Sequence, residues 1–274
     1  MEFFSTLEDI LQTSSPHDKI AKFEVFFQSY HDNKLEFNHN QTSKVFQNPS
    51  FYGVCEIVPA TKVPRRRALK TQKEKAILLH AITHIEYSAI DLALDHAYRF
   101  KNMPQEFYHD WLVVAEDEVR HFLMLEKLLK TQGFRYGDFG VHSFLFDTSM
   151  ATSKSLLDRM AVIPRYLEAS GLDANPKLLQ RVQKEGGEFS KEFEKALKII
   201  LDEEITHVQK GDKWFKWACE REGVNPANFY EIVERYLPGA TKKKEFVNIE
   251  FRKKAGYSCQ EIEVLAKERV CDDR

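Results

Sequence analysis

Four glutamates of this chain fall in the middle of apolar helical stripes. At about 100° per residue, the apolar positions of four long segments gather on one face of a helix, and each face carries a glutamate among them. These glutamates are Glu86, Glu118, Glu168 and Glu204. An unpaired carboxylate is costly to bury, so each one needs a compensating positive charge. The pattern therefore predicts helices packed around a charged group.

Two of the four glutamates begin a Glu-x-x-His motif. The motifs run from Glu118 to His121 and from Glu204 to His207. Side chains three residues apart leave a helix on adjacent turns of one face, so both can reach the same small volume. The other two glutamates stand alone on their stripes. A lone Glu followed by a Glu-x-x-His, repeated twice, is the ligand pattern of two-metal carboxylate bundles.

The sequence thus predicts a two-metal site. The six predicted ligands are Glu86, Glu118, His121, Glu168, Glu204 and His207. Four carboxylates balance the charge of two divalent cations, which removes the cost of burying them. Oxygen and imidazole donors suit iron or manganese, and the set contains no thiolate that would favour zinc or copper(I). We expect two iron ions, with manganese or a mixed pair as alternatives; a metal-free polar core is the competing interpretation.

The chain is expected to have three segments. Only 11 glycines and 9 prolines occur in 274 residues, which favours long helices. Residues 1–70 are predicted to form an N-terminal helical arm and an irregular wrap, 71–223 the four-helix bundle, and 224–274 a helical extension with a charged tail. The core helices are expected near residues 73–100, 104–132, 153–171 and 188–222. Gly171 is expected to end the third of these helices, and Pro176 to begin a further helix.

The expected compartment is the cytoplasm. No window approaches the roughly 18 to 20 uninterrupted apolar residues of a membrane span, and the first residues carry acids where a signal peptide needs a basic start. Membrane association is therefore not expected. The four cysteines are Cys55, Cys219, Cys259 and Cys271. They are predicted to be reduced thiols, with neither a zinc site nor a disulfide framework.

Several sequence blocks are similar to a known family. They are Val63–Arg66, Leu79–Ile82, His84–Glu86, Ala89–Asp95, Phe107–Trp111, Tyr136–Phe139, Pro164–Asp173 and Asp202–Val208. These blocks resemble the ferritin-like family catalogued as domain of unknown function 455, over residues 55–235. The resemblance implies an all-α, ferritin-like four-helix bundle and supports the same six ligands. It implies no particular reaction.

The helix order also resembles, more distantly, a di-iron hydroxylase that oxidises a modified adenosine in tRNA, and the rubrerythrin-like peroxidases. The preferred prediction is an oxygen- or peroxide-dependent oxidoreductase, hydroxylase-like, that acts on a small-molecule substrate. Because a rubredoxin-type cysteine pair is absent, an external electron donor is expected. The alternatives are a ferroxidase that binds iron or removes peroxide, and a tRNA-modifying hydroxylase. The long arm and tail fit a ferritin storage shell poorly.

Partners are only weakly indicated. Basic clusters at Arg65–Arg67, Lys242–Lys244 and Arg252–Lys254 would suit phosphates, but the net charge of -2 favours solvated clusters over a nucleic-acid partner. A homodimer is compatible with apolar outer patches. Asp91 and Asp95 are candidates to orient ligand histidines. His80 and His84 lie off the Glu86 face and are predicted to pack, with the orientation of ligands from outside as the alternative. Glu116, Asp117, Asp202 and Glu203 are predicted to point away from their stripes.

Overall fold

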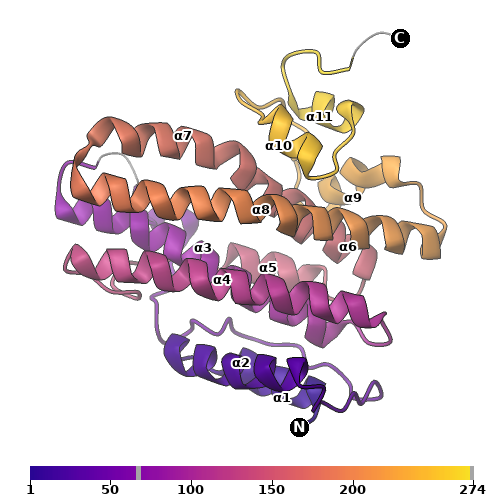
Figure 1. The fold of residues 1–274 in the computed structure, drawn as a ribbon. Helices are drawn as coiled ribbons and strands as arrows, with labels where there is room; N and C mark the ends of the chain where they lie inside the picture. The colour runs from indigo at the N-terminus through magenta and orange to yellow at the C-terminus, as the bar shows by residue number, and fades with distance from the viewer. Residues whose placement is uncertain (66–68, 272–274) are drawn as a thin grey trace. The chain divides into compact units, whose positions relative to one another are not determined.

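The computed structural model describes residues 1–65 and 69–271 (Figure 1). All regular elements in these ranges are helical, with only isolated bridges such as Ile57–Val141 and no strand, so the prediction of an all-α helical bundle fold is confirmed. Two compact units divide the chain, residues 1–150 and 151–274. The existence of a separate bundle segment over 71–223 stays a prediction.

The first unit begins with a helical arm. Helices α1 (Phe3–Gln12) and α2 (Pro16–His31) pack on each other, and α1 also contacts α3. Ser15 caps α2 and Pro16 occupies its first turn. An irregular stretch with one 3₁₀ turn, Ala60–Lys62, leads to the long helices. The short helix α5 (Phe144–Ala151) ends the unit.

Helices α3 (Gln72–Arg99) and α4 (Gln105–Thr131) form the main hairpin of the first unit. Their bounds agree with the predicted helices to within a residue. Thr71 and Glu74 form a capping box at the start of α3, which satisfies backbone donors that the helix leaves open. Of the described helices, α3 alone has the length and apolarity to span a membrane, but 72% of that apolar window is buried. Core helices pass the same test, so this is weak evidence for a membrane segment.

The second unit contains a helical hairpin followed by a C-terminal cover, which we define as residues 224–271. Helix α6 (Leu156–Met160) runs into a π-helical segment, η2 (Ala161–Glu168), and then into α7 (Ala169–Glu185). Helix α8 (Gly187–Glu222) returns beside α6, η2 and α7 (Figure 1). A 3₁₀ turn (Pro226–Asn228), α9 (Phe229–Tyr236), α10 (Ile249–Lys254) and α11 (Cys259–Leu265) follow.

The predicted stop at Gly171 is wrong, because α7 continues through both Gly171 and Pro176. A proline inside a helix leaves the carbonyl four residues earlier without its amide donor. Here that carbonyl belongs to Leu172, and the side-chain amide of Asn248 donates to it at 3.3 Å. A tertiary contact from the C-terminal cover therefore offsets the break that the local sequence favours.

The prediction of four reduced thiols is also wrong for one pair. Cys259 and Cys271 form a disulfide with a Cα–Cα distance of 5.1 Å, whereas Cys55 and Cys219 are buried and free. The chain after α11 folds back because the Glu263 carboxylate accepts the backbone N–H groups of Val270 and Cys271, each at 2.7 Å. This turn brings together two cysteines 12 residues apart.

Candidate metal centre

The first unit holds a compact group of three predicted ligands. Glu86 lies on α3, and Glu118 and His121 lie one turn apart on α4. Their exposed fractions are 4%, 0% and 0%. Each offers one ligand atom, and these atoms lie within 4.8 Å of one another. These three side chains form a buried Glu/His group that could hold a metal ion.

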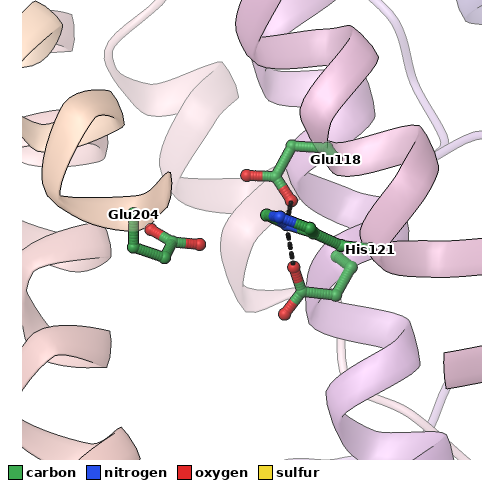
Figure 2. A group of neighbouring side chains, drawn as sticks. Glu118, His121 and Glu204 are labelled. Carbon is green, nitrogen blue, oxygen red and sulfur yellow. Dashed lines mark hydrogen bonds and ion pairs between the residues drawn. The ribbon is translucent and has the colours of Figure 1, made fainter. Parts of the chain in front are cut away.

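The imidazole of His121 lies between the two carboxylates (Figure 2). Its Nδ1 is 3.1 Å from Oε2 of Glu86 and 3.3 Å from Oε2 of Glu118. Burial, and then the charge of Glu118, raise the pKa of Glu86 to about 7. Burial alone would lower the pKa of His121, but the hydrogen bonds and charges of both glutamates outweigh it and raise the pKa to about 12.

These electrostatics fit a cation-binding site. Two carboxylates this close repel each other in a buried place, and a protonated His121 supplies the positive charge that holds them. A divalent cation would supply the same charge and would leave the imidazole nitrogen available as a ligand. The donors, two carboxylates and one imidazole, match the preferences of iron and manganese.

Apolar side chains surround the three ligands on the two helices. On α3, Ile82 and Ile90 are buried on either side of Glu86 along the helix, and on α4 Val114 and Phe122 flank Glu118 in the same way. The predicted stripes are thus real buried faces. They keep water from the polar group, which strengthens every electrostatic interaction within it.

The second unit carries the other three predicted ligands on two packed elements. Glu168 is the last residue of η2, and Glu204 and His207 lie one turn apart on α8 (Glu204 is labelled in Figure 2). Helix α8 packs on η2. His207 is fully buried, whereas the two glutamates are half-buried. Whether all six predicted residues form one site stays a prediction.

A glycine sets how closely α8 approaches η2. Gly211 lies one turn after His207, and a Cβ at this position would meet Cβ of Pro164 at 2.7 Å. Only glycine allows this approach without a shift of the backbone. Gly211 shares the face of α8 that carries Glu204 and His207. A glycine inside an otherwise apolar helix face was the signal for a close helix contact.

Buried arginines anchor the second unit, and sequence reasoning missed their role. Arg165 on η2 donates to Oδ1 of Asp212 and to Oε1 of Glu261, each at 2.7 Å, and its guanidinium lies 4.0 Å from the ring centroid of Phe229. Only 1% of its side chain is exposed. An arginine between apolar residues in the middle of a helix was the available signal.

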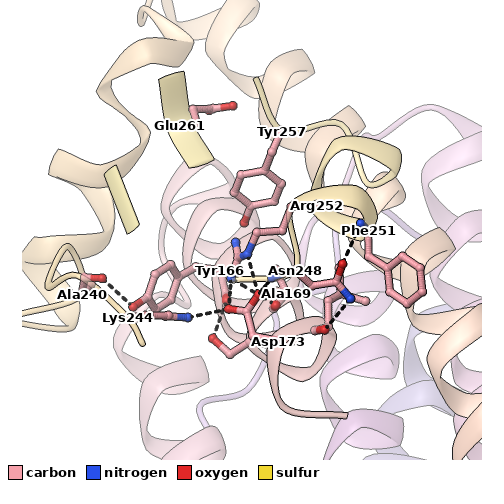
Figure 3. A network of polar contacts seen from close by, with 12 residues as sticks. Tyr166, Ala169, Asp173, Ala240, Lys244, Asn248, Phe251, Arg252, Tyr257 and Glu261 are labelled. Carbon is pink, nitrogen blue, oxygen red and sulfur yellow. Dashed lines mark hydrogen bonds and ion pairs between the residues drawn. The ribbon is translucent and has the colours of Figure 1, made fainter. Parts of the chain in front are cut away.

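A second ion-pair network holds α7 (Figure 3). Asp173 accepts from Arg252 at 2.7 Å and from Lys244 at 3.0 Å, and the Tyr166 hydroxyl donates to the carbonyl of Ala240 at 2.9 Å. These contacts join η2 and α7 to the C-terminal cover. The cover is therefore built into the core of its unit through charged side chains.

The remaining predicted polar residues have mixed outcomes. The hypothesis that Asp91 orients a ligand histidine is wrong, because Asp91 accepts from Lys19 Nζ and Ser50 Oγ. Packing roles for the two non-ligand histidines are confirmed: His84 Nδ1 lies 2.9 Å from the hydroxyl of Tyr136, and His80 Nε2 accepts the N–H of Gly137 at 2.9 Å.

The other acids can be placed more simply. Asp95 binds Arg99 one turn later on α3. Glu116 and Asp202 are exposed, and Asp117 and Glu203 are half-buried.

The basic clusters are largely used inside the molecule. Lys243 donates to the carbonyls of Glu263 and Ala266, and Lys244 and Arg252 both bind Asp173. These side chains therefore give no support to a phosphate-binding surface. Two arginines of the first cluster, at positions 66 and 67, lie outside the described residues.

Comparison with known proteins places the chain among relatives. The model of a family described as "Protein of unknown function (DUF455)" matches residues 12–263. An uncharacterized protein of Haemophilus influenzae is 33% identical over 280 residues, which cover 96% of this chain and 93% of the relative. No solved structure matches the chain.

Proposed function

Because the chain belongs to the family described as protein of unknown function (DUF455), whose description names no reaction, we propose its function from its own residues. It is an oxygen- or peroxide-dependent oxidoreductase with a centre of two metal ions, most simply iron. The observation that carries this proposal is the buried Glu86, Glu118 and His121 group, whose charges suit a bound cation. Buried acids of this kind are typical of functional sites.

The proposed ligand set consists of two matched halves. Glu86, Glu118 and His121 supply two carboxylates and one imidazole, and the second unit supplies the same number of each from Glu168, Glu204 and His207. Each half suits one metal ion, and the four carboxylates together balance two divalent charges. Manganese, or one iron with one manganese, would satisfy the same donors.

In this proposal the metal ions, the ligands and the apolar stripes have different roles. The bound metal pair would supply the redox chemistry with oxygen or peroxide. The carboxylates would hold the metals, while His121 and His207 would each bind one of them. The apolar stripes on α3 and α4 would exclude bulk water from this reaction. The electrons would come from an external donor, and the substrate would be a small organic molecule that is hydroxylated.

Metal content per chain tests the proposal. Protein purified without chelators should contain about two metal ions by elemental mass spectrometry, a stoichiometry expected for this ligand pattern. Glu118→Gln should lose metal, whereas Glu116→Gln on the same helix should keep it, because Glu116 is exposed. Near-zero metal after anaerobic loading with ferrous or manganous ion would overturn the proposal.

Oxygen consumption then separates the two candidate activities. Ferrous protein exposed to oxygen or peroxide should stop at a defined two-iron endpoint if the oxidoreductase is correct. Continued oxidation of added ferrous ion into a protein-held ferric core would instead favour the ferroxidase. Coupling between the two ions in Mössbauer spectra would show that they share one centre.

A further inference from the structure

The C-terminal cover carries a cysteine pair that the proposed oxidoreductase chemistry does not use. Cys259 begins α11, and its disulfide to Cys271 closes a covalent ring, residues 259–271, that includes this helix. We propose that this disulfide is a reversible latch, which a dithiol reductant opens and a peroxide closes, and which controls how firmly α11 holds the π-helical segment η2. The consequence for metal binding rests on the proposed function, since Glu168 ends η2.

Accessibility distinguishes this pair from the other cysteines. Cys259 and Cys271 are half-buried, and the neighbouring residues 258, 260 and 267–269 are exposed. Cys55 and Cys219 are buried at 4% and 1% exposure, and burial raises the pKa of each thiol to about 11. A thiolate reductant can therefore approach the disulfide, while the two buried thiols are poor nucleophiles that leave it undisturbed.

The disulfide is the covalent link in a segment that is otherwise held by hydrogen bonds and apolar packing. Within the ring, Glu263 accepts from the backbone of Val270 and Cys271, and Lys243 donates to the carbonyl of Ala266. The apolar residues Ile262 and Leu265 fix one face of α11. Opening the disulfide removes the covalent link between the first residue of α11 and the chain after the helix, and leaves both segments to non-covalent contacts such as the Ser258–Glu261 capping box. We therefore expect residues 267–271 and the first turn of α11 to open more often.

The first turn of α11 is connected to η2 by a buried ion pair. Glu261, two residues after Cys259, accepts from Arg165 at 2.7 Å, and their side chains are 16% and 1% exposed. The hydroxyl of Tyr257, shown with Glu261 in Figure 3, donates to the backbone carbonyl of Arg165. Loosening the first turn therefore removes one of two carboxylates that fix Arg165, leaving Asp212.

The chemistry of the latch is balanced. One thiolate of the reductant attacks a sulfur of the disulfide, and its second thiol then displaces the other chain sulfur; the reductant leaves as a disulfide and the chain gains two electrons and two protons as two thiols. Hydrogen peroxide closes it again. One thiol loses its proton, and the thiolate attacks the peroxide, breaks the O–O bond and gives a sulfenic acid and hydroxide, which takes up the released proton as water. The second thiol then displaces hydroxide from the sulfenic sulfur, and a second water leaves as the disulfide forms.

A reversible disulfide fits the compartment that the sequence predicts. In thiol-reducing compartments, such as the cytoplasm that the sequence predicts, disulfides of ordinary proteins are usually transient, catalytic or redox-sensing. A half-exposed pair on the outer cover of a peroxide- or oxygen-using protein fits a sensor of oxidant better than a permanent staple.

Hydrogen–deuterium exchange of the metal-free full chain tests the latch. Dithiothreitol should convert Cys259 and Cys271 to alkylatable thiols, and exchange should rise several-fold in α11 and also in η2, with α3 and α4 unchanged. Hydrogen peroxide should reverse both effects. Cys259→Ser should exchange like the reduced protein from the start. Reduction of the pair with no change in α11 or η2 would overturn the proposal.

A variant of the connecting residue tests the route. Glu261→Gln keeps the capping box with Ser258 but removes the charge that faces Arg165. In this variant α11 should still respond to reduction, and η2 should not. An η2 response as large as that of the parent chain would refute the role of Glu261. Because no metal is present, the result stands apart from any failure of the proposed metal centre.

Discussion

The two halves of the candidate metal centre are held in different ways. Glu86, Glu118 and His121 lie on two regular α-helices, are almost fully buried and contact one another. Glu168 ends a π-helical segment, and Glu168 and Glu204 are half-buried. Regular helix spacing positions the residues of the first half. The elements of the second half are held by the close contact at Gly211 and by buried arginines.

This difference indicates where the chain is able to adjust. A group formed by regular helices is set as soon as the hairpin forms, so it is suited to a fixed binding position. A π-helical segment often occurs at functional sites because it displaces a side chain from regular spacing. Holding that segment from the C-terminal cover makes the second half sensitive to changes far along the sequence.

The largest expected effect is a loss of unfolding free energy when a buried ion pair of either unit is broken. Asp173→Asn should reduce the free energy of unfolding by about 3–5 kcal/mol, because Arg252 is left buried and cannot release its proton. Asp91→Asn strands the buried Lys19 in the first unit, but burial already lowers the pKa of Lys19, so this lysine can become neutral and the loss should be smaller. Urea unfolding measures both, and equal losses would contradict the contrast.

The next effect concerns the ligands themselves. Glu118→Gln should weaken metal binding by about 100-fold, or about 2.7 kcal/mol, and Glu204→Gln by about 10-fold, or about 1.4 kcal/mol. The loss for Glu118 should be the greater, because this side chain is fully buried and faces His121. Competition titrations with a chelating dye measure the affinities. A greater loss for Glu204 would reverse the proposed ranking of the halves.

A smaller effect is expected from the glycine at the η2 contact. Gly211→Ala should cost about 1–3 kcal/mol of unfolding free energy, since the new methyl group would collide with Pro164. Gly171→Ala is the matched control: nothing lies within 4 Å of a Cβ there, and it should stabilise α7 by about 0.5–1 kcal/mol. Thermal unfolding of both variants measures whether each change lowers or raises the stability. An unchanged stability of Gly211→Ala would show that η2 can move away from the new methyl group.

Acid should remove only part of the stabilisation from the Asp173 ion pair, so this is the smallest of the expected effects. Burial alone would raise the pKa of Asp173, but the hydrogen bonds and charge of Arg252 outweigh it and hold the pKa below its usual 3.8. The stabilisation from this carboxylate is thus present above pH 3.8 and is lost as the pH falls through the lower folded value. Below pH 3.8 the parent chain should lose stability more steeply than Asp173→Asn. Parallel slopes in unfolding titrations would contradict this.

Much of the first half could be read from the sequence. The stripes around Glu86 and Glu118 and the spacing to His121 are local, so they predicted both helices and the grouping of the three side chains. The same reasoning placed Glu204 and His207 on α8 and gave the ends of that helix. It failed at Asp91, because the choice of Lys19 and Ser50 as partners depends on how the N-terminal arm packs.

The sequence by itself determined the helices α3, α4 and α8 and their buried faces, because each depends on side chains within a few turns of one helix. Only the tertiary structure decided the π-helical segment, the continuation of α7 through Pro176 and the pairing of Cys259 with Cys271. Arg165 finds its carboxylates 47 and 96 residues away. No local periodicity contains such partners, since they are chosen by the packing of the whole unit.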